Sequence, residues 1–197
     1  MSRRVDQSPL FGAGAARAVE LCVEDIPALQ EFFDANPEYF VSVTGEPPRP
    51  DEGHEEFHDE VPAGMSYTRK WMIGFVSESG DLIAMASVVS DLLAKHVWHI
   101  GLFVVATRLH GSGAANAMHA QLESWMRGHG AQWLRLGVVE GNARAERFWE
   151  KAGYREVRRR SGVEMGARIN VIRVMVKPLA GGTREEYLAR VPRDQPE

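Results

Sequence analysis

The sequence predicts an α/β fold of the α+β type, with a mixed sheet of six or seven strands flanked by helices. Three observations support this prediction. Strand-like segments follow one another with short links between residues 65 and 105, which is typical of an antiparallel meander. A glycine-rich turn, a helix and another apolar strand come next, and such a β-α-β unit places its strands in parallel. A hairpin pattern over residues 154–177 then closes the sheet.

Length and composition indicate one domain with a sizeable core, because the chain has 197 residues and 44% of them are hydrophobic. The net charge of −4 excludes the overall basic field that recruits nucleic acid. The single cysteine, Cys22, lies in an apolar run, so we expect a buried thiol in a reducing compartment rather than a reactive one. No apolar run reaches the roughly 18 residues of a membrane helix. We therefore expect a cytoplasmic protein without a membrane partner.

The N-terminal part is expected to begin with an unstructured segment. The predicted organisation is a disordered leader over residues 1–17, one domain over 18–178 and a polar C-terminal tail over 179–197. Residues 18–23 predict the first strand. Asp25 is expected to cap a helix that ends before Asn36, because the residue before a proline resists helical geometry. The chain is then irregular as far as Pro62, and residues 185–191 of the tail are a candidate short helix.

The central and C-terminal elements follow from hydrophobic spacing and glycine placement. Further strands are expected over residues 65–76, 82–89, 97–105, 133–139, 154–160 and 169–177. One helix begins after Gly113, carries apolar residues at helical spacing, and ends near Gly128 and Gly130. A second begins at Asn142, a good N-cap residue, and ends at Gly153.

The turn after the strand over 97–105 has the pattern Arg108-x-x-Gly111-x-Gly113 and predicts an anion site. The first turn of a helix offers unpaired N–H groups and a positive dipole end, and glycines let a phosphate approach the backbone. A P-loop would need Lys-Ser or Lys-Thr where Ala114-Ala115 stands. A dinucleotide fingerprint would need a third glycine where Asn116 stands. By itself the motif leaves a plain glycine turn open as the alternative.

A second motif, Asn-x-x-Ala-x-x-Phe-Trp-x-Lys-x-Gly-Tyr over residues 142–154, comes one helix and one strand later. Together, in this order and context, the two motifs resemble the signatures of the GNAT superfamily of N-acyltransferases. The resemblance covers about residues 18–178. It implies acetyl-CoA as acyl donor and a sheet whose fourth and fifth strands run parallel but splay apart, with pantetheine paired to the fourth strand like an added strand.

The resemblance also assigns roles to individual residues. Those implied to bind the cofactor are Phe103, Val104 and Val105 beside pantetheine, Leu109, His110, Gly111, Ser112, Gly113 and Ala114 at the pyrophosphate, Arg108 as a nearby charge, Asn142 on the pantetheine arm, and Phe148 and Trp149 at the thioester end. Trp149 stands where many relatives carry a tyrosine that protonates the leaving thiolate. An indole N–H cannot do this, so we expect a tunnel wall, with a thiolate that leaves unaided or is protonated by water or another residue.

The implied reaction is attack of a neutral primary amine on the thioester, followed by collapse of a tetrahedral oxyanion and loss of CoA thiolate. An amine with a pKa of about 10 must first lose a proton, so a base is expected. His99 and Glu140 are the first candidates for this base, and Tyr39 is the third.

His54-Glu-Glu-Phe-His58 matches the H-E-x-x-H pattern of zinc hydrolases. It lies in a short acidic segment between prolines and has no evident third ligand, so a chance match on an exposed helix is favoured and no metal is predicted. The six acidic residues between positions 51 and 60 indicate a solvated face, which would attract a cationic amine if it bordered the active cleft.

The sequence therefore predicts acetyl transfer from acetyl-CoA to a primary amine of an unspecified acceptor. Three alternatives stay open: a CoA-binding sensor without turnover, a different acyl-CoA donor, and an alcohol acceptor. A homodimer is compatible with the resemblance.

Overall fold

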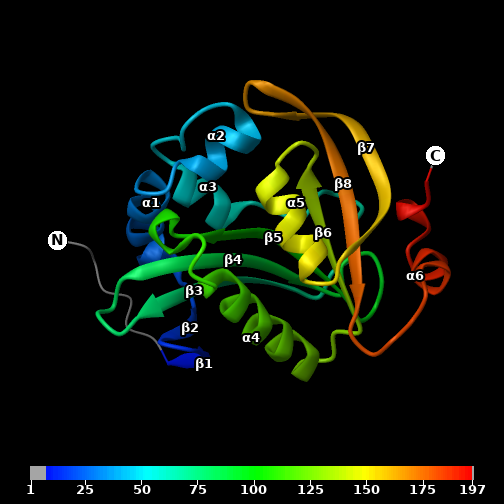
Figure 1. Cartoon of the computed structure of the whole chain (residues 1–197), viewed down its shortest axis with the longest axis horizontal. Helices are drawn as coiled ribbons and strands as arrows, with labels where there is room; N and C mark the ends of the chain where they lie inside the picture. The colour runs from blue at the N-terminus through cyan, green and yellow to red at the C-terminus, as the bar shows by residue number, and fades with distance from the viewer. Residues whose placement is uncertain (1–7, 197) are drawn as a thin grey trace.

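The computed structural model describes residues 8–196, which form one eight-stranded sheet (Figure 1). Its strands are β1 (Pro9–Ala13), β2 (Ala16–Glu20), β3 (Arg69–Ser77), β4 (Leu82–Ser90), β5 (Val97–Val105), β6 (Trp133–Val139), β7 (Arg155–Met165) and β8 (Arg168–Pro178). They lie in the order β1-β2-β3-β4-β5-β6-β8-β7, and among the strands of residues 8–196 only β5 and β6 pair in parallel. The predicted mixed sheet is confirmed, with one strand more than expected.

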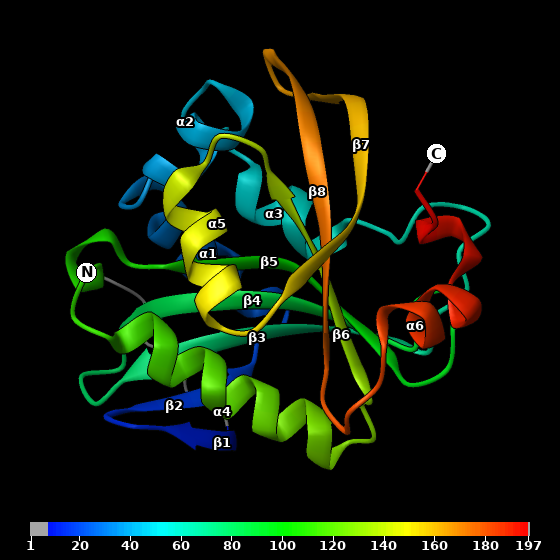
Figure 2. The same cartoon turned by 45° about the vertical axis from the view of Figure 1, so that its right-hand side comes forward.

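Helices cover both faces of the sheet. They are α1 (Ile26–Asp34), α2 (Glu38–Thr44), α3 (Glu52–His58), α4 (Ala114–Gly128), α5 (Ala143–Lys151) and α6 (Arg184–Arg190). Helices α4 and α5 lie on one face and α1, α2 and α3 on the other, as Figures 1 and 2 show. None of these described helices has the length and apolarity needed to cross a bilayer.

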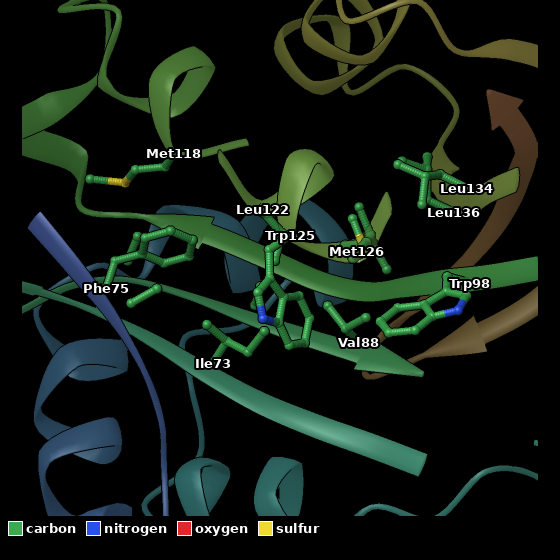
Figure 3. Packing of buried hydrophobic residues seen from close by; sticks show 14 of the residues in the cluster. Ile73, Phe75, Val88, Trp98, Met118, Leu122, Trp125, Met126, Leu134 and Leu136 are labelled. Carbon is green, nitrogen blue, oxygen red and sulfur yellow. The ribbon is translucent and has the colours of Figure 1, made fainter. Parts of the chain in front are cut away.

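Helix α4 packs on the sheet through an apolar stripe at helical spacing, seen in Figure 3. The stripe consists of Met118, Leu122, Trp125 and Met126. The ring centroid of Trp125 lies 5.0 Å from that of Trp71 and 5.8 Å from that of Trp98, both on strands beneath the helix. This aromatic contact fixes α4, and with it the loop that precedes the helix, relative to the sheet.

Part of the segment predicted as a disordered leader is a strand. Residues Pro9–Ala13 pair with β2, and the ring of Phe11 packs 5.7 Å from Trp125 and 6.0 Å from Phe75. Glycines and small residues interrupt the alternation of apolar and polar residues that is typical of a strand, so the sequence does not predict β1. Pairing with β2 orders this segment. Residues 1–7, also part of the predicted leader, lie outside the described residues.

The predicted tail is likewise folded against the sheet. Helix α6 begins with a capping box between Thr183 and Glu186, and its Tyr187 is fully buried. Asp194 forms a buried two-bond pair with Arg135 of β6, with 2.7 and 2.9 Å between nitrogen and oxygen, and accepts a hydrogen bond from Tyr187. Polar composition suggests a frayed tail, but the charged groups here are paired inside the protein.

Strands β5 and β6 separate halfway along their length, which opens the centre of the sheet (Figure 2). Their pairing runs from Val97 opposite Trp133 to Ile100 opposite Leu136 and then stops, although both strands continue. Gly101 is an extra residue in β5 relative to β4, a β-bulge at the point of separation. The edge of β5 beyond this point therefore has backbone groups that β6 does not pair.

Candidate active site

A cleft of about 520 Å³ lies where β5 and β6 diverge, and we call it the splay cleft. It is lined by Asn36, Glu38, Tyr39, Ser42, Phe103, Val104, Val105, Thr107, Leu109, His110, Gly111, Gly113, Ala115, Asn116, Asn142, Arg144, Ala145, Phe148 and Trp149. These residues come from the free edge of β5, the glycine loop, the first turn of α4, helix α5 and helix α2. The structure thus brings both sequence motifs to one cavity.

The glycine loop offers a small set of unpaired N–H groups. The N–H groups of Leu109, His110 and Ser112 donate to carbonyls of the loop, and that of Ala114 donates to the Ser112 hydroxyl. Within residues 109–114, those of Gly111 and Gly113 have no partner among the described residues. Both glycines have positive φ, of 79° and 87°, which side chains disfavour. Within residues 109–114, the N–H groups that remain free for an anion are therefore those of these two glycines.

A histidine and an arginine stand together beside this loop. His110 Nε2 lies 2.9 Å from the carbonyl oxygen of Val105, and Arg144 Nη1 lies 2.6 Å from His110 Nδ1. Because arginine only donates, His110 Nδ1 accepts and Nε2 carries the proton. Arg144 therefore presents a positive charge at the mouth of the splay cleft. Sequence reasoning missed this residue, although it lies inside the second motif, because an exposed arginine on a helix has no distinctive pattern.

Three residues assigned to the cofactor, Arg108, Ser112 and Ala114, do not line the cleft. Arg108 lines a separate hollow beside α1. Ser112 donates to the Leu109 carbonyl at 2.7 Å and accepts from the Ala114 N–H, which holds the shape of the loop. Ser112 and Ala114 therefore contribute to the shape of the loop.

Aromatic rings form the apolar end of the cleft. Phe103 of β5 stacks on Phe148 of α5 with 6.0 Å between centroids and 22° between planes, and Trp149 lies 5.9 Å from Phe103. Trp149 is buried and packs 5.2 Å from Tyr154, whose hydroxyl lies 3.1 Å from His119 Nε2. Burial lowers the pKa of His119 to about 4, so this imidazole stays neutral.

Asn142 joins three elements at the roof of the cleft. Its Oδ1 accepts from the Ala145 N–H at 3.2 Å, which caps α5 as predicted, and its Nδ2 lies 3.2 Å from the Ser42 hydroxyl of α2. The side chain is therefore held in place and lines the cavity that the resemblance assigned to it.

A second cavity of about 700 Å³ adjoins the first and shares Glu38, Ser42 and Asn142 with it. We call it the adjoining cavity. Its remaining walls come from the end of β6, the start of α5 and the start of β8, namely Pro37, Val41, Val139, Glu140, Gly141, Ala143, Arg168 and Asn170. It lies at the carboxyl end of β6, on the other side of the shared residues.

The tip of the β7–β8 hairpin is fastened to the end of α2 above this cavity. Ala167 N–H donates to the Thr44 carbonyl at 2.9 Å, Asn170 donates to the Val43 carbonyl at 2.9 Å, and Arg168 donates to that of Ser42 at 2.8 Å. The last turn of a helix leaves such carbonyls unsatisfied, and the hairpin supplies their donors.

The three predicted bases have different surroundings. His99 Nδ1 lies 3.1 Å from the Arg135 carbonyl, and burial followed by the Arg135 charge lowers its pKa to about 3. Glu140 lines the adjoining cavity, but its carboxylate pairs with Arg159 at 2.5 Å. Tyr39 lines the splay cleft, and burial raises its pKa, so its hydroxyl stays protonated. Neither His99 nor Glu140 lines the splay cleft. The shifted pKa values of His99 and Tyr39 make both side chains poor bases near neutral pH.

The H-E-x-x-H segment forms α3, and His54 and His58 lie on its exposed side with 4.2 Å between ring centroids. Within residues 8–196 no three side chains of the metal-binding types gather into a metal site. Cys22 is partly buried, and a hydrogen bond with Glu24, burial and Asp25 raise the pKa of its thiol to about 11.

Comparison with known proteins agrees with this architecture. The ribosomal-protein-S18-alanine N-acetyltransferase of Escherichia coli has a TM-score of 0.63 at 16% identity, covering 85% of this chain and 96% of its own. An acetyltransferase of Thermus thermophilus gives 0.66 at 19%, covering 86% and 100%. Spermidine N-acetyltransferase of Vibrio cholerae, solved with CoA and spermine, gives 0.64 at 15%, covering 88% and 98%.

No curated protein sequence matches the chain. The model of the acetyltransferase (GNAT) family matches residues 29–154, which include both motifs and the residues that line the splay cleft. The chain therefore belongs to the acetyltransferase (GNAT) family.

Proposed function

We propose that this protein transfers an acetyl group from acetyl-CoA to a primary amine. The observation that carries the proposal is the coincidence, in one cleft, of the two unpaired loop N–H groups of Gly111 and Gly113 with the unpaired edge of β5. The first binds a diphosphate, and the second binds an extended amide-bearing arm as an added strand would. Acetyl-CoA carries both groups.

The cofactor would lie with its diphosphate on the loop and its pantetheine arm along Phe103 to Val105. Arg144 would contact the phosphates, because it stands beside His110 at the cleft mouth. The thioester would then reach the apolar end near Phe148 and Trp149, where few waters compete with the amine.

The amine would enter through the adjoining cavity, since that cavity meets the splay cleft at Glu38, Ser42 and Asn142. Its lone pair attacks the thioester carbon, the C–S bond breaks, and CoA leaves as the thiolate. A thiol of this class has a pKa of about 8–9, so the thiolate leaves without an acid at the position of Trp149. Most of the rate would come from holding the two reactants in line. The lone cysteine fits a cytoplasmic setting for this reaction.

Calorimetry with acetyl-CoA and a thiol-release assay over a panel of spermidine, tyramine and a lysine peptide test this function. We expect stoichiometric binding and release of CoA with at least one amine. Binding without turnover of any amine would favour the sensor. Turnover only with longer acyl-CoA donors would favour a different donor, and turnover only with alcohols would favour an alcohol acceptor. A protein that fails to bind acetyl-CoA would contradict the proposal.

A further inference from the structure

We propose that the acceptor is a free α-amino acid and that Arg168 of β8 binds its carboxylate. The inference rests on the proposed function, since it names the acceptor class of that same site. Arg168 lies at the tip of the β7–β8 hairpin, which reaches α2 (Figures 1 and 2), and its side chain lines the adjoining cavity. It belongs to neither of the two sequence motifs.

The charged side chains that line the adjoining cavity are Glu38, Glu140 and Arg168. Glu140 pairs with Arg159 at 2.5 Å, which largely neutralises its charge. Glu38 accepts a hydrogen bond from the Thr107 hydroxyl at 2.5 Å, and Arg168 donates to a backbone carbonyl. Neither of these two residues forms a salt bridge within residues 8–196. The cavity therefore has one carboxylate and one guanidinium that can bind charged groups of a substrate.

The two charges belong to different walls of the cavity. Glu38 lies on the wall shared with the splay cleft, where under the proposed function the amine meets the thioester, whereas Arg168 lines the adjoining cavity alone. The hydrogen bond from Thr107 lowers the pKa of Glu38, so its carboxylate stays ionised and attracts an ammonium group. An acceptor with its amino end beside Glu38 would therefore have its other end toward Arg168.

Ser42 shows that the guanidinium lies close to the shared wall. Asn142 Nδ2, on that wall, lies 3.2 Å from the Ser42 hydroxyl, and Arg168 Nη1 donates to the Ser42 carbonyl at 2.8 Å. One residue thus contacts both Asn142 and Arg168. In an α-amino acid a single carbon atom separates the amino group from the carboxylate. A compact acceptor of this kind suits an amine position and a guanidinium that lie so close together.

The guanidinium of Arg168 is held in place and still has donors available. Arginine carries five N–H donors, and within residues 8–196 its hydrogen bond goes to the Ser42 carbonyl. A Cβ at Gly45 would lie 3.0 Å from Arg168 Nε, so the side chain packs against the end of α2. The Ala167 N–H and the Asn170 amide fasten the same turn to α2. The remaining donors can bind a carboxylate through two hydrogen bonds, the geometry that arginine favours.

The same arrangement disfavours a second amino group on the acceptor. The far ammonium of a polyamine would meet the like charge of Arg168, whereas a carboxylate would pair with it. Pro37, Val41 and Val139 add apolar surface to the cavity, which favours a hydrocarbon side chain on the acceptor. The site therefore favours an amino acid such as leucine over a polyamine such as spermidine.

Leucine and leucinamide, added to the amine panel, test the role of the acceptor carboxylate. Because the amide also changes the basicity of the amine, the ratio of their kcat/KM values is compared between proteins. We expect R168A to lower kcat/KM for leucine by about tenfold or more and to change that for leucinamide by less than about twofold. R168K, which keeps the charge, should recover part of the leucine value. R160A alters an exposed arginine of the same hairpin that lines neither cavity, and it should keep the wild-type ratio.

Calorimetric titration of leucine into the complex with CoA gives a readout that does not depend on turnover. The Kd for leucine should be about tenfold weaker in R168A than in the wild type, and added salt should narrow this difference. An equal leucine-to-leucinamide ratio in R168A and the wild type would overturn the assignment of Arg168, and a wild type that prefers spermidine to leucine would overturn the acceptor class, while the proposed function stands in both cases. A wild type that binds acetyl-CoA but acetylates no amine, leucine included, would instead contradict the proposed function.

Discussion

Two arginines lie near the glycine loop, and the structure separates their roles. Arg144 lines the splay cleft beside His110, whereas Arg108 lines a hollow beside α1. Arginine is always charged and matches phosphate geometry. The one that faces the cavity should therefore contribute to cofactor binding.

We expect R144A to weaken acetyl-CoA binding roughly tenfold, the loss of one charge-assisted contact at an exposed site. The loss should shrink as salt is raised, because exposed charges are screened. R108A is the matched control and should change the Kd by less than about twofold. Calorimetry at low and high salt measures both variants, and equal losses in the two would contradict the assignment.

The Glu56 carboxyl should affect the pH dependence of stability, because burial raises its pKa to about 7. A carboxyl whose pKa is higher in the folded than in the unfolded protein binds more protons when folded, so stability falls as pH rises from about 4.3 toward 7. E56Q lacks this titration. Denaturant unfolding at pH 5 and pH 8 should therefore show the wild type losing stability relative to E56Q, by of the order of 2 kcal/mol. A parallel pH dependence of the two proteins would mean that the carboxyl is not perturbed.

The residues that could be predicted from sequence are those with a backbone reason for their identity. Gly111 and Gly113 need positive φ, and Asn142 caps a helix, so their local structure could be predicted from the sequence, whereas their place at a cofactor site came from the family resemblance. Side-chain contacts made across long sequence separations were not predictable in this way. The direction of Arg108 and the surroundings of Glu56 depend on which strands and helices lie opposite them, which local patterns do not encode.

Among the elements, the β7–β8 hairpin has strands that could be predicted from the sequence and a contact with α2 that could not. Its two strands are expected from alternation, but its attachment to α2 joins residues that lie far apart in the sequence. Arg168 and Asn170 of the hairpin line the adjoining cavity, so the hairpin tip helps to shape the space proposed for the acceptor.

Two glycines of this hairpin provide a variant and a matched control that test the contact between the hairpin tip and α2. Gly166 has φ +58°, and a Cβ there would lie 2.6 Å from Thr44 Cβ, while Gly162 has φ +72° and no atom within 4 Å. Both alanine variants carry the strain of left-handed backbone, but only G166A adds a clash. We expect G166A to lose about 1–3 kcal/mol more stability than G162A in urea unfolding. Equal losses would show that the hairpin tip moves freely away from α2.

At the scale of the whole molecule, both ends of the described chain complete the sheet. The expected leader contributes β1, and the expected tail contributes α6 and the pair between Asp194 and Arg135. The short helix expected over residues 185–191 is confirmed as α6, but composition did not predict that either end packs on the sheet, because small or polar residues gain order from partners elsewhere in the fold. The parallel pair, the meander and the two flanking helices were predictable because their apolar patterns are strong and local.

The buried ion pair between Asp194 and Arg135 holds the C-terminal segment on the sheet, and its contribution to stability can be measured. Burial opposes ionisation of Asp194, but hydrogen bonds from Arg135 and its charge outweigh this and lower the pKa of Asp194. D194A would leave Arg135 buried without its partner, at a cost of about 3–5 kcal/mol in stability. R193A, a change in the exposed neighbouring side chain, should cost little. The wild type should lose this contribution as the pH falls below the ordinary aspartate range, because Asp194 becomes protonated in the folded protein only when the pH reaches its lowered pKa. Thermal unfolding of the three proteins checks the prediction.

The wall shared by the two cavities has a consequence for kinetics. Glu38, Ser42 and Asn142 belong to both spaces, so under the proposed function each substrate would have its own route inward and neither would have to depart before the other arrives. Double-reciprocal plots at several fixed amine concentrations should therefore intersect instead of running parallel, the pattern of a ternary complex without an acetylated enzyme.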